Sequence, residues 1–416
     1  MARKPKQTQL NKFYQSVSII LTNTGLLFLI LNLFLFFPSV LRDAEVHTRQ
    51  DQANADRIRL RPGQPLLTPK RNGHQMMWTD LRSYEHVDPN HVKQVLDDFF
   101  DLGQKGYAYF PYTHFTEPTF SSPTLNLQAD EQGFVSRRIS HKQESKYPLR
   151  VFAFGGSTTF GWHVGDEETI PSFLERELQQ KLRRQGNWRR VEVTNFGKGF
   201  NSWYQEMVLF ERLLHAGYKP DVVVFLDGVN VLHADSPYEI PYWNDKMTEL
   251  WDQAQISTTS LPGMLPLFRV LNYFKRRHLN KWVRNFQVDR HPSSHTYALP
   301  DWVKRVQESY LNTLTQIDAI SATKKIQAYY FWQPNRAFDC QSGKYSQPLP
   351  THYTHKMVPL YTAMRTVERP HFRFLGDLCR TFGFDKRVIV DDVHYSPAFN
   401  EFIAGEMARH INIARR

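Results

Sequence analysis

From about residue 150 to the C-terminus, short apolar runs alternate with longer segments of helical periodicity. In the longer segments, such as residues 170–182 and 302–317, apolar side chains recur every three or four positions, which is typical of a helix with one buried face. The short runs are typical of buried strands and cover residues 151–154, 191–194, 221–226, 326–331 and 388–390. This alternation predicts an α/β fold in which helices cover both faces of a parallel sheet.

A continuous apolar segment near the N-terminus departs from this pattern. Residues 17–37 contain no charged side chain, and a helix of that length at 1.5 Å per residue spans a hydrocarbon core of about 30 Å. The preceding residues 1–16 carry basic but no acidic side chains, so the positive-inside rule predicts a cytoplasmic tail. Because no small-residue cleavage site follows, an uncleaved single-pass anchor is favoured over a signal peptide.

The remaining chain divides into three parts by composition. Residues 42–74 are polar and rich in proline and predict a juxtamembrane linker. Residues 75–148 lack clear periodicity and predict an N-terminal elaboration that packs on the main domain, residues 149–416. A helical insertion is predicted at about 231–300. Its basic, aromatic stretch fits a substrate lid, a helix lying on the bilayer or an ordinary helical subdomain.

Charge and cysteine content add limited constraints. The formal net charge is +11, which suits an anionic membrane surface, an acidic polymer or simply a basic soluble surface. No nucleic-acid-binding motif accompanies it, so no nucleic-acid partner is expected. The cysteines Cys340 and Cys379 either pair outside the cytoplasm or remain buried thiols. The 17 histidines form no zinc-type motif, so neither a metal nor a cofactor is predicted.

The first candidate for chemistry lies directly behind the run 151–154. There the sequence reads Gly-Gly-Ser-Thr-Thr-Phe-Gly, with the serine at position 157. The glycines allow a sharp turn, and a helix that begins at Ser157 offers unpaired backbone N–H groups to a developing oxyanion. Ser157 is therefore a candidate nucleophile, although a structural helix cap produces the same local pattern.

Three further motifs follow apolar runs. They are Asn-Phe-Gly-Lys-Gly ending at Gly199, Gly-Val-Asn ending at Asn230, and Asp391 three residues before His394. A neutral imidazole suits the removal of a serine proton, and a carboxylate fixes its tautomer and stabilises the imidazolium that forms. Taken alone, the Asp-x-x-His spacing also fits the approach to a helix that begins near Pro397.

With these four motifs in this order, residues 150–410 resemble the SGNH, or GDSL-like, hydrolase family, and in particular membrane-anchored bacterial members with a GGSTTFG-type first block. The resemblance implies a three-layer α/β/α, flavodoxin-like fold. It also implies Ser157 as nucleophile, His394 as general base and Asp391 as the group that orients it. Gly199 and Asn230 would complete the oxyanion hole.

Two positions depart from the family pattern. The second-block glycine of many relatives corresponds to Phe200 here, and glycines stand at 197 and 199 instead, so either Gly197 or Gly199 is the candidate donor. In the third block, Val231 replaces the usual aspartate, while the amide donor Asn230 is intact. Chemistry that depends on the asparagine amide is expected to survive this change.

Other catalytic motifs fit poorly. Thr159 breaks the G-x-S-x-G pattern of α/β-hydrolases, and neither a Walker loop nor a dinucleotide fingerprint is present. The resemblance instead implies an extracytoplasmic serine esterase or O-acyltransferase, anchored in the bacterial inner membrane and acting on acylated cell-envelope carbohydrate, because relatives often act there and the many aromatic side chains could stack on sugar rings. A lipase or lysophospholipase and a catalytically silent scaffold of a polysaccharide assembly are the alternatives. Expected partners are the bilayer, the substrate and other envelope-assembly membrane proteins.

Overall fold

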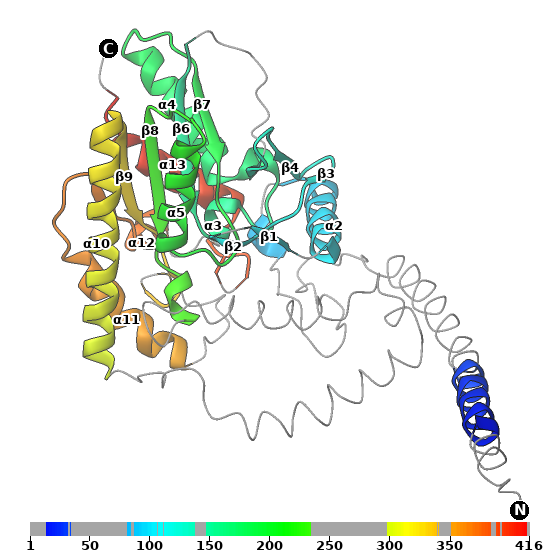
Figure 1. The fold of residues 1–416 in the computed structure, drawn as a ribbon. Coiled ribbons are helices and arrows are strands. Elements are labelled where there is room, and N and C mark those ends of the chain that lie inside the picture. Colours follow the sequence, from blue (N-terminus) through cyan, green and yellow to red (C-terminus); the bar gives the residue numbers. More distant parts are fainter. Residues whose placement is uncertain are drawn as a thin grey trace, which may run out of the picture. The chain divides into compact units, whose positions relative to one another are not determined.

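The computed structural model describes residues 14–31 and most of residues 81–137, 147–233, 298–340, 351–383 and 388–413. The chain divides into two compact units, one of residues 1–59 and 246–293, the other of residues 60–245 and 294–416. The predicted linker at 42–74 and nearly all of the predicted insertion at 231–300 lie outside the described residues. The strands and helices of the second unit are drawn in Figure 1.

The second unit is built on an eight-stranded sheet with the order β10-β9-β8-β6-β7-β5-β4-β3. Its parallel part consists of β6 (Leu149–Gly155), β7 (Val191–Asn195), β8 (Val222–Asp227), β9 (Gln327–Trp332) and β10 (Phe372–Phe374). Numbered along the chain, these five strands have the order 2-1-3-4-5, which is the flavodoxin-like doubly wound arrangement. The predicted α/β fold is therefore confirmed.

Helices cover both faces of the parallel strands (Figure 1). One face packs against α5 (Trp203–His215), α10 (Leu299–Lys324) and α11 (Thr351–Arg365), and the other against α4 (Ile170–Arg184) and α13 (Pro397–His410). Along β8, Val223 and Phe225 enter the first core while Val222, Val224 and Leu226 enter the second. A strand buried on both faces reads as a continuous apolar run, because successive side chains point to opposite faces.

The expected strand at 388–390 is wrong. Its residues form a tight turn instead, in which the N–H of Val390 donates to the carbonyl of His394 at 2.8 Å and that of Ser396 to Val388 at 2.9 Å. Ile389 and Tyr395 form an isolated antiparallel bridge across this turn. Residues 388–390 hydrogen-bond to residues 394–396 of the same turn instead of to a neighbouring strand. Strand β10 takes the fifth parallel position of the sheet.

The described part of residues 81–137 extends the sheet. It contains η1 (Leu81–Tyr84), α2 (Pro89–Lys105) and a small sheet of β1 (Ala108–Phe110) and β2 (His114–Thr116). Strands β3 (Phe120–Ser121), β4 (Asn126–Ala129) and β5 (Val135–Arg137) then add to the main sheet in antiparallel fashion through the pair Arg137 and Asn195. The smaller helical elements are α3 (Ser157–Phe160), η2 (Asp166–Glu168), η3 (Asn230–His233) and α12 (Leu378–Phe382).

The first unit contributes one described helix, Tyr14–Leu31. Its 18 residues have a mean hydropathy of 1.5 and are long and apolar enough to cross a membrane. Large apolar side chains such as Leu21, Leu27 and Ile30 are more than half exposed. This helix overlaps the predicted span 17–37 and agrees with a single-pass anchor.

Candidate active site

Ser157 lies at the point where the sheet meets its first short helix. Strand β6 ends at Gly155, and α3 begins at Ser157 with Gly156 as its N-cap. A Cβ atom on Gly156 would come within 2.2 Å of the Asn230 side-chain nitrogen, so this position requires a glycine. The close approach brings the serine and the asparagine of two distant motifs to the same edge of the sheet.

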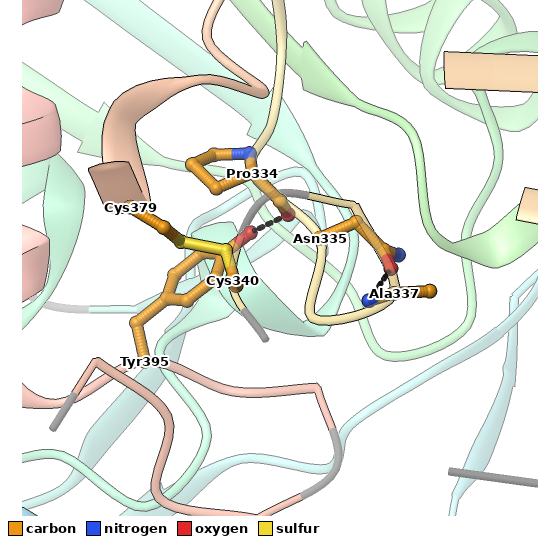
Figure 2. Close-up of a disulfide and its surroundings, with 6 residues drawn as sticks. All are labelled: Pro334, Asn335, Ala337, Cys340, Cys379 and Tyr395. Atoms are coloured by element: carbon orange, nitrogen blue, oxygen red, sulfur yellow. Dashed lines mark hydrogen bonds between the residues drawn. A yellow bond between two sulfur atoms is a disulfide. The ribbon is translucent and has the colours of Figure 1, made fainter. Parts of the chain in front are cut away.

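His394 is presented by the turn at 388–396 that precedes α13. The neighbouring Tyr395 is buried, and its hydroxyl donates to the carbonyl of Pro334 at 2.6 Å, which fastens the turn to the end of β9 (Figure 2). The disulfide between Cys340 and Cys379 lies beside this contact and joins the segment after β9 to α12. Of the two states expected for these cysteines, the structure has the bridge.

Ser157, His394 and Asp391 form one continuous chain of contacts. The His394 Nε2 atom is 2.8 Å from the Ser157 hydroxyl oxygen, and its Nδ1 atom is 2.6 Å from Asp391 Oδ2. His394 is buried, whereas Ser157 remains partly exposed. This order of contacts allows Nδ1–H to donate to the carboxylate while Nε2 accepts the hydroxyl proton.

The carboxylate of Asp391 is buried but strongly bonded. Burial opposes its ionisation, yet the charges and hydrogen bonds of His394 and His163 prevail and hold the pKa of Asp391 well below its ordinary value. Its Oδ1 atom also accepts the backbone N–H groups of Val393 and His394, both at 2.7 Å. Asp391 is therefore ionised in the pH range in which imidazole titrates.

Asn230 approaches the serine from the end of β8. It begins η3 and lines a small pocket together with Gly156, Asn201, Gly228 and Gln333. Its side-chain amide donates to the carbonyl of Asn201, which uses one of its two N–H groups. The carbonyl of Asn201 does not use the second N–H group of this amide.

Neither second-block glycine offers an unoccupied N–H in this structure. The N–H of Gly197 donates to the side chain of Asn195 at 2.9 Å, and that of Gly199 donates to the carboxylate of Glu117 at 2.7 Å. Phe200, which stands where many relatives have glycine, adopts a left-handed backbone with φ of 61°. A left-handed backbone is uncommon for a residue other than glycine.

Two residues of the site, Glu117 and His163, were not predicted from the sequence. Glu117 is buried and follows β2, in a region with no recognisable motif. His163 follows the serine motif closely, and its Nε2 atom lies 3.3 Å from Asp391 Oδ2. The position of His163 in the run Gly-Trp-His directly after α3 is the one sequence signal that points to it.

His163, Asp391 and His394 are also the one group of potential metal ligands found in the described part of the chain. Both ring nitrogens of His394 are already engaged, one with Asp391 and the other with Ser157. The arrangement therefore fits proton transfer better than metal coordination, and the expectation of no metal stays a prediction.

Comparison with known proteins gives distant structural neighbours. No protein-family model and no curated protein match the sequence. The chain is similar to the acetyl xylan esterase AlAXEase at 15% identity and a TM-score of 0.31, a match that covers 64% of this chain and 100% of that one. It is similar to a lipase from a goat rumen metagenome at 14% identity and a TM-score of 0.36, covering 63% and 96% of the two chains. For a putative lipolytic protein of the G-D-S-L family from Desulfitobacterium hafniense, the identity is 12%, the TM-score 0.31 and the coverage 63% and 99%.

These neighbours are esterases and lipases by description, but the identities and TM-scores are low. The fold assignment therefore rests on the strand order, and the function has to be argued from the geometry around Ser157.

Proposed function

We propose that this chain is a serine esterase or O-acyltransferase of SGNH type that uses Ser157, His394 and Asp391. The observation that carries the proposal is the unbroken line of contacts from the Ser157 hydroxyl through the His394 ring to the Asp391 carboxylate. Ser157 and His394 are 237 positions apart in sequence, so local chain geometry does not account for their contact.

The reaction proceeds in two half-reactions. His394 Nε2 takes the Ser157 hydroxyl proton as the oxygen attacks the acyl carbonyl, and the same proton then passes to the departing alcohol as the ester bond breaks. The acyl group is left on Ser157. Water or an acceptor hydroxyl attacks it in the second half-reaction, again giving its proton to His394, which produces hydrolysis or transfer respectively.

The negative charge on the carbonyl oxygen needs donors near Ser157. The Ser157 N–H at the start of α3 has no acceptor within its own helix, and the Asn230 amide lies beside Gly156. Removal of one such donor costs about 3 kcal/mol of barrier in serine enzymes. Gly199 is the third candidate, and it joins the oxyanion hole once the Glu117 carboxylate has moved away from its N–H.

We place this domain outside the cytoplasm at the bacterial inner membrane. The helix Tyr14–Leu31 and the basic residues before it support an anchor with a cytoplasmic N-terminus. In this proposal residues 149–416 form the catalytic domain, residues 75–148 its elaboration and residues 42–74 the linker to the membrane. Partners are the bilayer, the substrate and other envelope-assembly membrane proteins, without nucleic acid.

Acylated envelope carbohydrate is the proposed substrate. The indole of Trp162 lies 6.4 Å from the His394 ring between centroids, and an aromatic face at that place suits stacking on a sugar ring. Acetyl release from acetylated oligosaccharides should therefore exceed fatty-acid release from a lysophospholipid when both are assayed with the detergent-solubilised full chain. The opposite preference would favour a lipase at the membrane surface.

The central test is covalent labelling of Ser157. A fluorophosphonate probe should label the wild-type chain, and Ser157→Ala should abolish the label while circular dichroism remains unchanged. Ser121→Ala, a change at an exposed position of β3, is the matched control and should label normally. A folded wild-type chain that takes no label would favour the catalytically silent scaffold.

A further inference from the structure

The Asp391 carboxylate contacts two imidazoles. His394 Nδ1 is 2.6 Å from Oδ2, and His163 Nε2 is 3.3 Å from the same oxygen. All three side chains are at least nine-tenths buried, so this contact is made out of bulk water. The His163 and His394 rings meet edge to face with their centroids 5.6 Å apart.

The chain holds His163 in this place by several independent contacts. Its backbone takes a left-handed conformation with φ of 66°, which is uncommon for a residue other than glycine. The Tyr84 hydroxyl donates to the His163 carbonyl at 2.6 Å, and the Phe99 ring packs on the imidazole with the centroids 5.8 Å apart. A strained residue persists only when its surroundings over-determine it.

Arg137 fixes the backbone on both sides of His163. From β5, its buried guanidinium donates to the carbonyls of Phe160, Gly161 and Val164 at 2.6–2.7 Å, and it pairs with Asp166 at 2.8 Å. Three carbonyls of a single turn thus converge on one side chain of the N-terminal elaboration. Tyr84, Phe99 and Arg137 all come from that same region of the sequence.

We propose that His163 is a positioning residue of the triad, held by the N-terminal elaboration, which orients the Asp391 carboxylate toward His394 and limits its basicity. The inference rests on the proposed function. The His163 Nε2 atom, 3.3 Å from Oδ2, offsets part of the negative charge of the carboxylate, so Asp391 stabilises the imidazolium form of His394 less than it would alone. It also restrains rotation of the carboxylate, which keeps Oδ2 aligned with Nδ1.

Several ionisable residues from different elements face His163. Asp391 and His394 come from the turn before α13, Tyr84 from η1 and Arg137 from β5, while Glu168 of η2 acts electrostatically on Tyr84. Burial, with Asp391 and Glu168 adding to it, raises the pKa of Tyr84 well above its ordinary value. Tyr84 therefore stays uncharged between pH 5 and 8.

Two variants of His163 distinguish the effect of its nitrogen on Asp391 from the effect of its planar ring. His163→Phe keeps a planar ring and removes the nitrogen, whereas His163→Gln keeps an N–H donor at the end of a side chain of similar reach. We expect His163→Phe to lower kcat about tenfold with little change in KM, because the Asp391 carboxylate loses a buried polar contact that positions it. The acidic limb of kcat/KM should move to higher pH, and His163→Gln should restore most of both.

An NMR titration of the His394 ring tests this inference without relying on esterase activity, so it can fail or succeed independently of the proposed function. In the full chain labelled at histidine Cε1, the pH midpoint of the His394 ring signal, assigned by its loss in His394→Ala, should rise in His163→Phe. Identical midpoints in His163→Phe and wild type would overturn the inference even if the chain is an active esterase. A wild type without esterase activity would reject the proposed function, while the midpoint still tests the contact.

A second variant, His163→Asn, tests the same contact if His163→Phe does not fold. Asparagine tolerates the left-handed backbone at position 163 better than phenylalanine, and its side chain is too short to reach Asp391. If His163→Phe does not fold, His163→Asn should show the same upward shift of the His394 midpoint. An unshifted midpoint in a folded His163→Asn chain counts against the inference as fully as it would in His163→Phe.

Discussion

At the scale of single residues, His394 is the group on which the proposed chemistry depends most. It alone contacts both the hydroxyl and the carboxylate, and its ring accepts and returns every proton of the two half-reactions. His394→Ala should therefore lower kcat by about three orders of magnitude or more without loss of folding. His215→Ala, an exposed histidine in the last turn of α5, serves as the control and should keep full activity.

The measurement for this prediction is ester turnover together with thermal unfolding of each variant. A His394→Ala chain that turns over at the wild-type rate would remove His394 from the mechanism. A chain that unfolds at much lower temperature would instead assign it a structural role.

Glu117 supports a second prediction at this scale. Its carboxylate accepts the Gly199 N–H, the proposed third oxyanion donor, and so places a negative charge beside that group. Glu117→Gln keeps a weaker acceptor and removes the charge, so a substrate competes more readily for Gly199 and kcat should rise several-fold. Glu131→Gln, an exposed position in the same N-terminal region, is the control.

Glu117 also stabilises the buried charge of Lys198, so the stability of the Glu117 variant needs its own measurement. Burial lowers the pKa of Lys198 to about 8, although Glu117 raises it in part. Without that carboxylate the buried ammonium is less favourable, so the unfolding temperature of Glu117→Gln has to be measured beside its activity. Unchanged or reduced kcat in a well-folded variant would exclude Gly199 as an oxyanion donor.

The order of the four motifs, through the resemblance to SGNH hydrolases, predicted Ser157, His394 and Asp391 as one site, and the three side chains are in contact. Glu117 could not be predicted. It lies 82 positions before Gly199, and only the fold brings its carboxylate to that amide. His163 stands next to the serine motif, but its contact with Asp391 depends on a left-handed backbone that sequence periodicity does not reveal.

At the scale of elements, strand length decided which predictions succeeded. The runs that became β6, β8 and β9 have six or seven residues and are buried on both faces, so their apolar pattern is continuous. Strand β10 has three residues, none fully buried, and its pattern could not be distinguished from a loop. The run 388–390 is apolar because Val388 packs into the core beside α13 and Val390 packs with Tyr84 and Val92, not because it joins the sheet.

The disulfide is the element-scale feature with the clearest stability effect. Cys340 and Cys379 are 39 positions apart, and the bridge ties the segment after β9 to α12 beside Tyr395 (Figure 2). A bridge of this kind contributes about 2–4 kcal/mol, mainly by restricting the unfolded chain. Replacing both cysteines by serine should lower the denaturant midpoint of the second unit accordingly.

Reduction of the wild-type chain provides the matched control, since it breaks the bond without changing the sequence. Treatment with a thiol reductant should lower the midpoint to that of the double serine variant and leave the variant itself unaffected. Equal midpoints for oxidised, reduced and substituted chains would show that the bridge adds no stability.

At the scale of the whole molecule, the 2-1-3-4-5 strand order explains why the motifs meet. Ser157 follows β6 and Asn230 follows β8, and these two strands are neighbours in the sheet although β7 lies between them in sequence. Ligands of doubly wound sheets bind outside the carboxyl ends of the strands at such a switch point. Alternating strand and helix patterns predicted a parallel sheet, but no pattern along the chain specifies which strands become neighbours.

The same strand junction buries two carboxyl groups. Glu206 of α5 and Asp227 at the end of β8 are almost fully buried, and among the described residues no hydrogen-bond donor is found for either oxygen of Glu206 or for Oδ2 of Asp227. Burial raises the pKa of Asp227 to about 7 despite an opposing contribution from Glu206. Burial, reinforced by Asp227, also raises the pKa of Glu206 well above its ordinary value.

This pair predicts a fold that loses stability as the pH rises. Both carboxyls bind protons more tightly in the folded than in the unfolded chain, so their stabilising effect is complete below the ordinary carboxyl pKa and is lost as the pH passes through about 7. The unfolding temperature should fall by several degrees between pH 5 and pH 8, given about 2–4 °C per kcal/mol for domains of this size. Glu206→Gln, which cannot ionise, should unfold at higher temperature than wild type at pH 8 and show a shallower pH dependence. The exposed Glu211→Gln on the same helix should follow wild type, and a wild-type unfolding temperature that rises from pH 5 to pH 8 would contradict the assignment.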